Sequence, residues 1–148
     1  MSKSDAFEND LLLLLFNNTN IANLGDATGV RGSTAAGSIF VSLHTADPGE
    51  TGNQGTSETT YTSYARVAVA RSGAGWTVSG SAPTQASPVA NIDFPACTGG
   101  TATITHAGAG VSTSGANRLM YSGTVTPNIS VSTGVTPRLT TASTITED

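Results

Sequence analysis

The fold is decided by residues 61–78, which read Tyr-Thr-Ser-Tyr-Ala-Arg-Val-Ala-Val-Ala-Arg-Ser-Gly-Ala-Gly-Trp-Thr-Val. Side chains alternate between the two faces of a strand, so Val67 and Val69 share one face and the neighbouring alanines share the other. The Gly-containing break after Arg71 lets the chain turn into a second short strand, which carries the only tryptophan. The pattern predicts a β-hairpin with a core face of small and β-branched side chains. It supplies no catalytic chemistry.

A single β-rich domain follows from the length and composition. A chain of 148 residues is a usual size for one domain, and 37% hydrophobic residues suffice for a core. The chain has 24 Thr and 17 Ser, whereas only 11% of its residues are charged, compared with about 25% in average domains. Thr favours strands because its Cβ is branched. The net charge of −4 is too small for a disordered chain, so we expect the body to be folded.

Short strand-like segments alternate with turn residues along the rest of the chain. The clearest is 38–44, in which Ile39, Val41 and Leu43 are expected to face the core. The other predicted strands cover residues 89–94, 101–111, 118–125, 129–132, 135–139 and 140–146, with loops over 23–37, 45–60 and 79–88 and a turn at 126–128. This pattern predicts an all-β fold, an antiparallel β-sandwich or jelly-roll-like barrel with one short N-terminal helix.

Particular residues predict local irregularities in these segments. Gly108 and Gly110 mark a close backbone approach or a bulge. Pro137 breaks its segment and indicates an edge strand or a bend. Asp47-Pro48-Gly49 is a strong turn signal, since Pro restricts φ and Gly permits positive φ. The surrounding loop, 45–60, is long enough to suggest a function such as an intersubunit arm.

A helix is predicted over residues 5–17. Ser4 is suited to cap its start, acidic residues in its first turn favour the positive end of the helix dipole, and Asn17-Asn18 ends it. We expect an N-terminal helical arm over 1–20 and a single β-domain over 21–148. The apolar run 11–16 is too short to cross a bilayer, which needs about 20 residues. The acidic start of the chain argues against a signal peptide.

The helix is apolar on more than one face. One stripe at helical spacing contains Phe7, Leu11, Leu14 and Leu15. Leu12, Leu13 and Phe16 lie partly outside it. Two arrangements are therefore open: burial of one face on the chain's own sheet with the other against a neighbouring subunit, or burial entirely within the chain's own fold.

Several function classes are disfavoured. The acidic balance and scattered arginines argue against nucleic acid binding. Cys97 is the only cysteine, lies next to apolar residues and is expected to be a small buried side chain. Asp47, Glu50 and Glu58 share one loop without the spacing of a calcium loop, and two histidines without a close carboxylate pair disfavour zinc. We expect no cofactor, no metal and no membrane partner.

Two groups of residues have side chains of the types found in catalytic sites or in sugar-binding sites. Ser42, His44 and Asp47 form a Ser-His-Asp triad on paper, but no nucleophile elbow is present and Asp47 precedes a Pro, as turn residues often do. His44 at the end of a strand is expected to bond locally or lie at an interface. A stacking platform for a sugar ring, made of Tyr61, Tyr64 and Trp76, is disfavoured against core and interface roles for these rings. The chain is therefore expected not to be an enzyme.

A weakly charged surface rich in hydroxyl groups suits a protein packed against copies in an assembly. The alternative is an isolated soluble β-protein. The residues expected to contact neighbours lie on the apolar helix and in the 45–60 loop with its following residues. They are Phe7, Leu11, Leu12, Leu13, Phe16, Asp47, Glu50, Glu58, Tyr61 and Tyr64.

Three stretches, Phe7–Thr19, Phe40–Gly52 and Tyr64–Arg71, give the chain a family resemblance. Their order and wording resemble a family of small structural proteins of tailed bacteriophages and prophages, often labelled tail fibre proteins, some of which look like capsid decoration proteins. The segment 94–100 and the Thr-rich end fit the same pattern. The resemblance covers nearly the whole chain and implies a virion β-domain without catalytic residues.

The resemblance leaves the place in the virion open. The compact β-pattern, with no fibre repeat or long helical shaft, favours a capsid decoration protein, a cement or minor capsid protein that binds the outer face of the head shell and stabilises contacts between capsomers. Its expected partners are the major capsid protein and copies of itself, with a trimer favoured. It would be made in the host cytoplasm and placed on the capsid exterior. The alternative is a tail fibre or tail-tip component that contacts tail proteins and takes part in host attachment.

Overall fold

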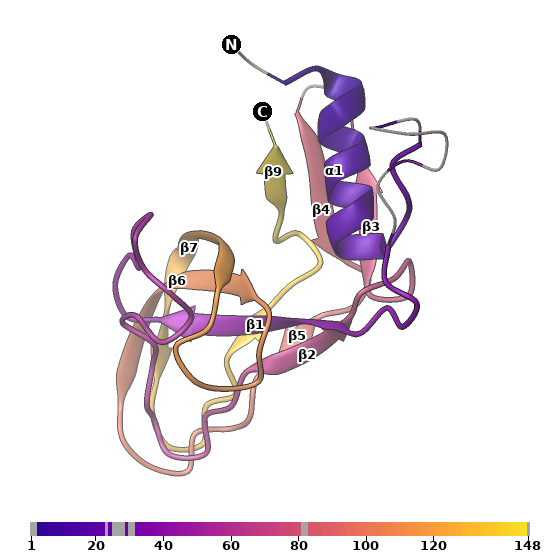
Figure 1. The fold of residues 1–148 in the computed structure, drawn as a ribbon. Helices are drawn as coiled ribbons and strands as arrows, with labels where there is room; N and C mark the ends of the chain where they lie inside the picture. Colours follow the sequence, from indigo (N-terminus) through magenta and orange to yellow (C-terminus); the bar gives the residue numbers. More distant parts are fainter. Residues whose placement is uncertain (1–2, 23, 25–28, 30–31, 81–82, 148) are drawn as a thin grey trace. The chain divides into compact units, whose positions relative to one another are not determined.

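The computed structural model describes residues 3–22, 24, 29, 32–80 and 83–147 (Figure 1). Its elements in chain order are α1 (Asp5–Asn17), β1 (Ser38–His44), β2 (Val67–Ala70), β3 (Trp76–Ser79), β4 (Thr84–Pro88), β5 (Ile92–Asp93), β6 (Ala102–Gly110), β7 (Leu119–Val131), β8 (Arg138–Leu139) and β9 (Ile145–Glu147). The strands form sheets with the orders β2-β1-β6-β7, β3-β4-β9 and β5-β8. The pairings of β1 with β6, β6 with β7, β3 with β4, β4 with β9 and β5 with β8 are antiparallel. The predicted all-β, sandwich-like fold with one short N-terminal helix is confirmed.

The chain forms two compact units. We name Met1–Ser38, Val69–Asn91 and Thr140–Asp148 the helical unit, and Ile39–Ala68 and Ile92–Leu139 the four-stranded unit. In the helical unit, α1 lies along β3 and β4 (Figure 1). The division into an arm over 1–20 and a β-domain over 21–148 stays a prediction. The predicted loop 23–37 lies partly outside the described residues, and its described part contains neither helix nor strand.

The helix begins and ends where the sequence predicts. The Ser4 hydroxyl accepts a hydrogen bond from the Phe7 N–H at 3.4 Å, so one free donor of the first turn is satisfied. At the other end Asn18 adopts the left-handed conformation with φ 58°, and its N–H donates to the Leu13 carbonyl. Because both signals are local, a helix over 5–17 was predictable from sequence alone.

The buried face of the helix differs from the predicted stripe. Glu8, Leu12 and Phe16 are the buried row, spaced four residues apart. The Phe16 ring meets the Trp76 ring of β3 edge-on with centroids 4.9 Å apart. Phe7 is 38% exposed, and the other residues of the predicted stripe, Leu11, Leu14 and Leu15, are only half-buried. Since residues 11–16 are all apolar, periodicity cannot identify which face meets the sheet.

Arg71 ties the end of the helix to the segment after β2. Its guanidinium donates to the carbonyls of Leu14 and Leu15 at 2.7 Å each, and to the Ser33 hydroxyl at 3.2 Å. The last carbonyls of a helix lack partners within the helix, and a cation there also interacts favourably with the helix dipole. Arg71 therefore connects the end of α1 to the segment that links β2 to β3.

The predicted β-hairpin around residues 67–78 is wrong, although both of its strands exist. β2 joins the sheet that contains β1, whereas β3 pairs with β4. The turn at Ser72–Gly75 thus passes the chain from one sheet to another. The predicted alternation in β2 is confirmed, since Val67 and Val69 are half-buried and the alanines are exposed. Alternation reports which face is buried but not which strand is the partner.

The prediction of a loop over 79–88 is also wrong for the second half of this range. Thr84–Pro88 forms β4, the central strand of β3-β4-β9. Thr84, Ala86 and Pro88 are buried on the face that α1 covers, while the residues between them are half-buried. The inward residues are small or polar, so the strand has no run of large apolar side chains to reveal it. The helix needs such small residues for close packing on the sheet.

The four-stranded unit has its core along β1 and β6. Ile39, Val41 and Leu43 are buried, as predicted. Gly108 and Gly110 were predicted to mark a close backbone approach or a bulge, and the pairing of β6 with β7 does shift register between Ala109 and Gly110. Both glycines are closely approached by side chains. A Cβ on Gly110 would lie 2.2 Å from the Gln54 side chain, and one on Gly108 would lie 2.9 Å from the His44 ring. Gly108 therefore makes room for the His44 side chain of β1, and Gly110 makes room for the Gln54 side chain of the 45–60 loop.

The predicted turn at 126–128 is instead an irregularity within one strand. β7 runs from Leu119 to Val131, and its pairing with β6 skips from His106↔Thr124 to Ile104↔Ile129. Residues 125–128 therefore form a bulge that does not end the strand. Three predicted strands are shorter than expected, since β5, β8 and β9 occupy only 92–93, 138–139 and 145–147.

Leu12→Ala is expected to lower the free energy of unfolding by about 2–5 kcal/mol, because the Leu12 side chain is fully buried and its truncation leaves a cavity in the core. Leu11→Ala, one residue earlier and half-buried, is the matched control and should cost clearly less. Urea denaturation followed by circular dichroism measures both. Equal losses would contradict the assignment of the buried helix face.

Candidate functional site

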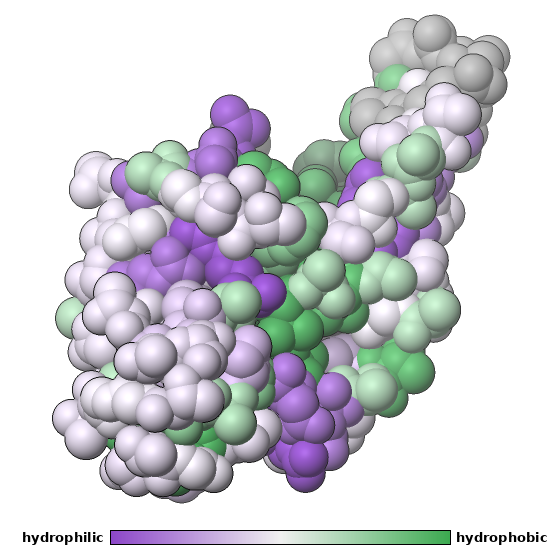
Figure 2. Space-filling model, turned by 90° about the horizontal axis from the view of Figure 1, so that it is seen from below, coloured by the Kyte–Doolittle hydropathy of each residue, from purple (hydrophilic) through white to green (hydrophobic). Residues whose placement is uncertain are grey.

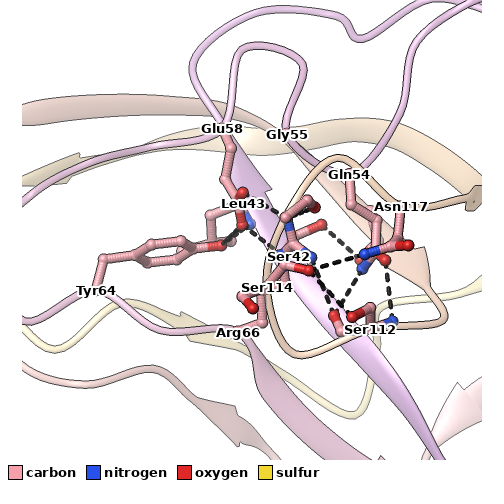
Figure 3. A network of polar contacts seen from close by, with 12 residues as sticks. Ser42, Leu43, Gln54, Gly55, Glu58, Tyr64, Arg66, Ser112, Ser114 and Asn117 are labelled. Carbon is pink, nitrogen blue, oxygen red and sulfur yellow. Dashed lines mark hydrogen bonds and ion pairs between the residues drawn. The ribbon is translucent and has the colours of Figure 1, made fainter.

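Two loops of the four-stranded unit are held together at their base by buried polar contacts (Figure 3). The first loop covers 45–60 and follows β1, and the second covers 111–118 and joins β6 to β7. We name the side chains that join them, Gln54, Glu58, Tyr64 and Arg66, the Arg66 network. The exposed parts of the two loops are the surface that this network positions.

Arg66 is the centre of the network. Its side chain is 2% exposed, and its Nε and Nη2 donate to the two carboxylate oxygens of Glu58 at 2.7 Å each. The same guanidinium donates to the carbonyls of Ser112 at 3.0 Å and Gly115 at 2.8 Å. The Glu58 carboxylate holds the pKa of Arg66 above its ordinary value. A buried charge must be paired in this way, so the Arg66 side chain fixes the second loop to the first.

Gln54 adds a second connection between the loops. It has no exposed surface, and its Oε1 accepts from the N–H groups of Val111 and Ser112 at 3.1 and 3.0 Å. Its backbone N–H donates to the Asn117 carbonyl at 2.8 Å. Neither Gln54 nor Arg66 was among the predicted site residues. The absence of a Cβ on Gly110, beside which Gln54 packs, is the signal in the sequence, but it does not identify its partner.

The tyrosines join this network from the hydrophobic side. The Tyr64 hydroxyl donates to Glu58 at 2.9 Å and accepts from the Leu43 N–H at 3.0 Å. Its ring stacks near Phe94 and meets the Tyr61 ring edge-on at 5.4 Å. Burial raises the pKa of Tyr64 and raises that of Tyr61 to about 12. Tyr61 is 5% exposed and Trp76 3% exposed, so these rings form no open platform for a sugar.

Ser42 and His44 form only part of the triad considered from sequence. The Ser42 hydroxyl lies 2.8 Å from His44 Nε2, and His44 Nδ1 lies 2.8 Å from the Thr56 carbonyl. A carbonyl only accepts, so Nδ1 carries the proton and Nε2 accepts from Ser42. Asp47 is engaged elsewhere, since it accepts from the Gly49 N–H at 2.9 Å in the predicted turn. Ser42 and His44 have no exposed surface.

His44 is held neutral by its surroundings. Desolvation lowers its pKa from the ordinary 6.5, although the hydrogen bond to the Thr56 carbonyl opposes this shift. The expectation that His44 bonds locally is confirmed by its two partners. Cys97 is 1% exposed, as predicted, and its thiol lies 3.2 Å from the Gly99 carbonyl.

Within the described ranges, no three or more side chains of His, Cys, Asp and Glu cluster in a way that could hold a metal ion. Nor does the described part of the chain contain a helix long and apolar enough to cross a bilayer.

The predicted contact residues separate into buried and accessible sets. Leu12 and Phe16 have no exposed surface and belong to the core of the helical unit, whereas Phe7, Leu11 and Leu13 retain some. Glu58, Tyr61 and Tyr64 come together in and beside the Arg66 network. Asp47 and Glu50 are exposed at the far end of the first loop.

Asp47 and Glu50 line an open pocket of about 400 Å³ beside the start of β7. Gly49 and Gly52 complete the loop side, and Leu119–Ser122 form the strand side. Sequence reasoning missed the strand residues, since nothing local places them next to the loop.

Pale tints of intermediate hydropathy dominate the surface visible in Figure 2, as the low charged fraction predicts. Purple and green atoms lie in separate groups.

A family model described as Podophage GP4 fiber I protein gp80 matches residues 2–146 of the chain. No curated protein matches it.

Arg66→Met should destabilise the protein by about 3–5 kcal/mol, because it leaves Glu58 and two loop carbonyls without their partner. Thermal unfolding measures the loss. Arg138→Met, which removes a pair with Asp93 at the exposed surface, is the control and should destabilise the protein far less than Arg66→Met, because solvent screens an exposed pair. A small effect at Arg66 would show that the network does not hold the loops.

Below pH 6.5 the protein should lose stability, because the unfolded chain binds a proton at His44 that the folded protein excludes. The loss should grow as the pH falls from 6.5 toward the lowered pKa of the folded state. His44→Gln, which does not titrate, should show a flatter dependence of the unfolding free energy over this range. Parallel pH profiles for the two proteins would rule out His44 as the cause.

Proposed function

Since the matched family model spans nearly the whole chain, the chain belongs to the family of the Podophage GP4 fiber I protein gp80, and we propose that it is a tail fibre component that takes part in host attachment. Family membership makes the chain a phage structural protein and a component of the virion. The finer assignment to the tail and to attachment is our proposal.

The family description is the observation that carries this proposal. From the sequence alone, a capsid decoration protein is the first expectation and a tail fibre component is the alternative, and the word fiber in the family description favours the alternative. The first ranking rested on the absence of repeats and of a long helical shaft. A compact domain without a shaft is also compatible with a fibre built from several proteins, so that argument does not decide between them.

The geometry of the loops supports a binding role. The Arg66 network fixes the base of the loops 45–60 and 111–118. Their exposed residues are 45–47, 49–51, 55, 57, 60, 111 and 113–118. A surface that is fixed before contact loses less conformational entropy on binding than a mobile one. Its exposed groups include hydroxyls, backbone, the amide of Asn117 and the charged side chains of Asp47, Glu50 and Arg118, and polar groups of this kind suit the polar surface of a cell.

In the proposed role, the protein acts by binding to the host surface and catalyses no reaction. Ser42 and His44, the pair with the most suggestive chemistry, are closed to solvent. Tail proteins and further copies of the chain are its proposed partners in the virion.

Antibodies against the chain, bound to intact phage particles and seen by electron microscopy, are expected to mark the tail. Purified protein added to host cells should also reduce adsorption of the phage, whereas the same protein after irreversible unfolding should not. Label spread over the head would overturn the tail assignment in favour of capsid decoration. Tail label without competition for adsorption would restrict the protein to a structural role in the fibre.

A further inference from the structure

β7 is an edge strand of the sheet β2-β1-β6-β7, and none of its 13 residues is charged. Edge strands present unpaired N–H and C=O groups, and proteins usually protect them with charged side chains, prolines or bulges. Here the bulge at 125–128 interrupts the second half, and a register shift between Ala109 and Gly110 of β6 leaves Met120 out of the pairing near the start. The regularly paired stretch Tyr121–Thr124 between these two irregularities has no charge and no proline. Ser122, Gly123 and Thr124 are exposed.

The hydrogen bonds of β1 show which main-chain groups of β7 point outward. The Leu43 N–H donates to the Tyr64 hydroxyl, and the Leu43 carbonyl accepts from the Thr59 N–H at 2.9 Å, so both groups point away from β6. Leu43 is paired with Ala107 in register. In an antiparallel ladder, the main-chain groups of Ala107 therefore point away from β1 and toward β7.

The direction of the main-chain N–H and C=O groups alternates from residue to residue, so the direction at Ala107 also fixes the directions along β7. Ala107 is paired with Gly123, so the main-chain groups of Gly123 are used within the sheet. The N–H and C=O groups of the two neighbours, Ser122 and Thr124, point to the open side. Among the described residues, no hydrogen bond to a partner on that side is found for either. The free edge is thus symmetric about Gly123.

Such an edge is complementary to itself. When a second copy runs antiparallel with a two-fold axis at Gly123, Ser122 of each copy pairs with Thr124 of the other and four hydrogen bonds form. The two Gly123 residues then face each other in the close pair of the ladder, where Cα atoms lie about 4.5 Å apart. A Cβ placed on Gly123 meets no atom within 4 Å in the chain itself, so the site is open.

In this arrangement, the bulge at 125–128 of the second copy lies next to the pocket beside β7 of the first copy. In this register Ser122 of one copy opposes Thr124 of the other, so the bulge at 125–128 of the second copy comes toward Leu119–Tyr121 of the first. Leu119–Ser122 are the strand side of the pocket. Thr126, Pro127 and Asn128 are exposed, and the hydroxyl and amide groups among them are donors suited to the carboxylates of Asp47 and Glu50. Because β7 is uncharged, no like charges meet across the axis.

We propose that two copies of the chain associate through the outer edges of their β7 strands, antiparallel about Gly123, with the bulge of each copy seated in the pocket of the other. The pairing is a dimer rather than the trimer that the sequence analysis favoured. It stands on the sheet geometry and does not depend on attachment to a host.

Sedimentation velocity on the full chain should show a monomer–dimer equilibrium. Thr124→Pro removes the outward N–H and leaves the internal ladder of Gly123 in place, so it should raise the dissociation constant of the dimer about tenfold or more. Thr124→Ala keeps the main-chain groups and is the matched control, expected to change that constant no more than about twofold. A monomer at all concentrations, a trimer, or a dimer insensitive to Thr124→Pro would overturn the proposal.

Amide hydrogen exchange on the unaltered protein tests the same contact without a variant. The amides of Ser122 and Thr124 should be protected at high protein concentration and lose protection on dilution, while the amide of Gly123 stays protected at both. If Ser122 and Thr124 exchange fast in the dimer, its interface lies elsewhere and the proposal fails.

Discussion

The loops of the four-stranded unit depend on a single buried cation. The Arg66 side chain is buried, and its charge is met by the Glu58 carboxylate and by the carbonyls of Ser112 and Gly115. Each of these partners is needed, because a buried guanidinium with missing partners is costly. The requirement sets the positions of both loops and brings the Tyr64 hydroxyl to Glu58. A chain with little charge thus places one of the few ion pairs found among its described residues where a precise loop position is needed.

Local signals made part of the fold predictable. Ser4 and Asn18 define the helix, and Ile39, Val41 and Leu43 define β1, because each effect acts between residues close in the chain. The partner of β2 was not predictable, since alternation carries no information about pairing. β4 was missed because its inward positions are Thr84, Ala86 and Pro88, which lack the apolar size of a usual core strand.

The candidate site was less accessible to sequence reasoning. The 45–60 loop and the turn at Asp47 were recognised, but Arg66 bonds to carbonyls 46 and 49 residues away, and any residue type offers such acceptors. The residues at the strand side of the pocket were missed for the same reason. The resemblance of residues 7–19, 40–52 and 64–71 identified the phage structural family correctly, and the match to a fibre family then reversed the order of the two virion roles.

The interleaving of the two units has a consequence for how the protein is made. The chain crosses between them four times, and β9, near the end of the chain, completes the sheet on which the first helix lies. During synthesis, the helix therefore cannot complete its packing on this sheet until residues 145–147 have been made. A chain that stops before β9 lacks one of the three strands of this sheet, so it cannot complete the helical unit.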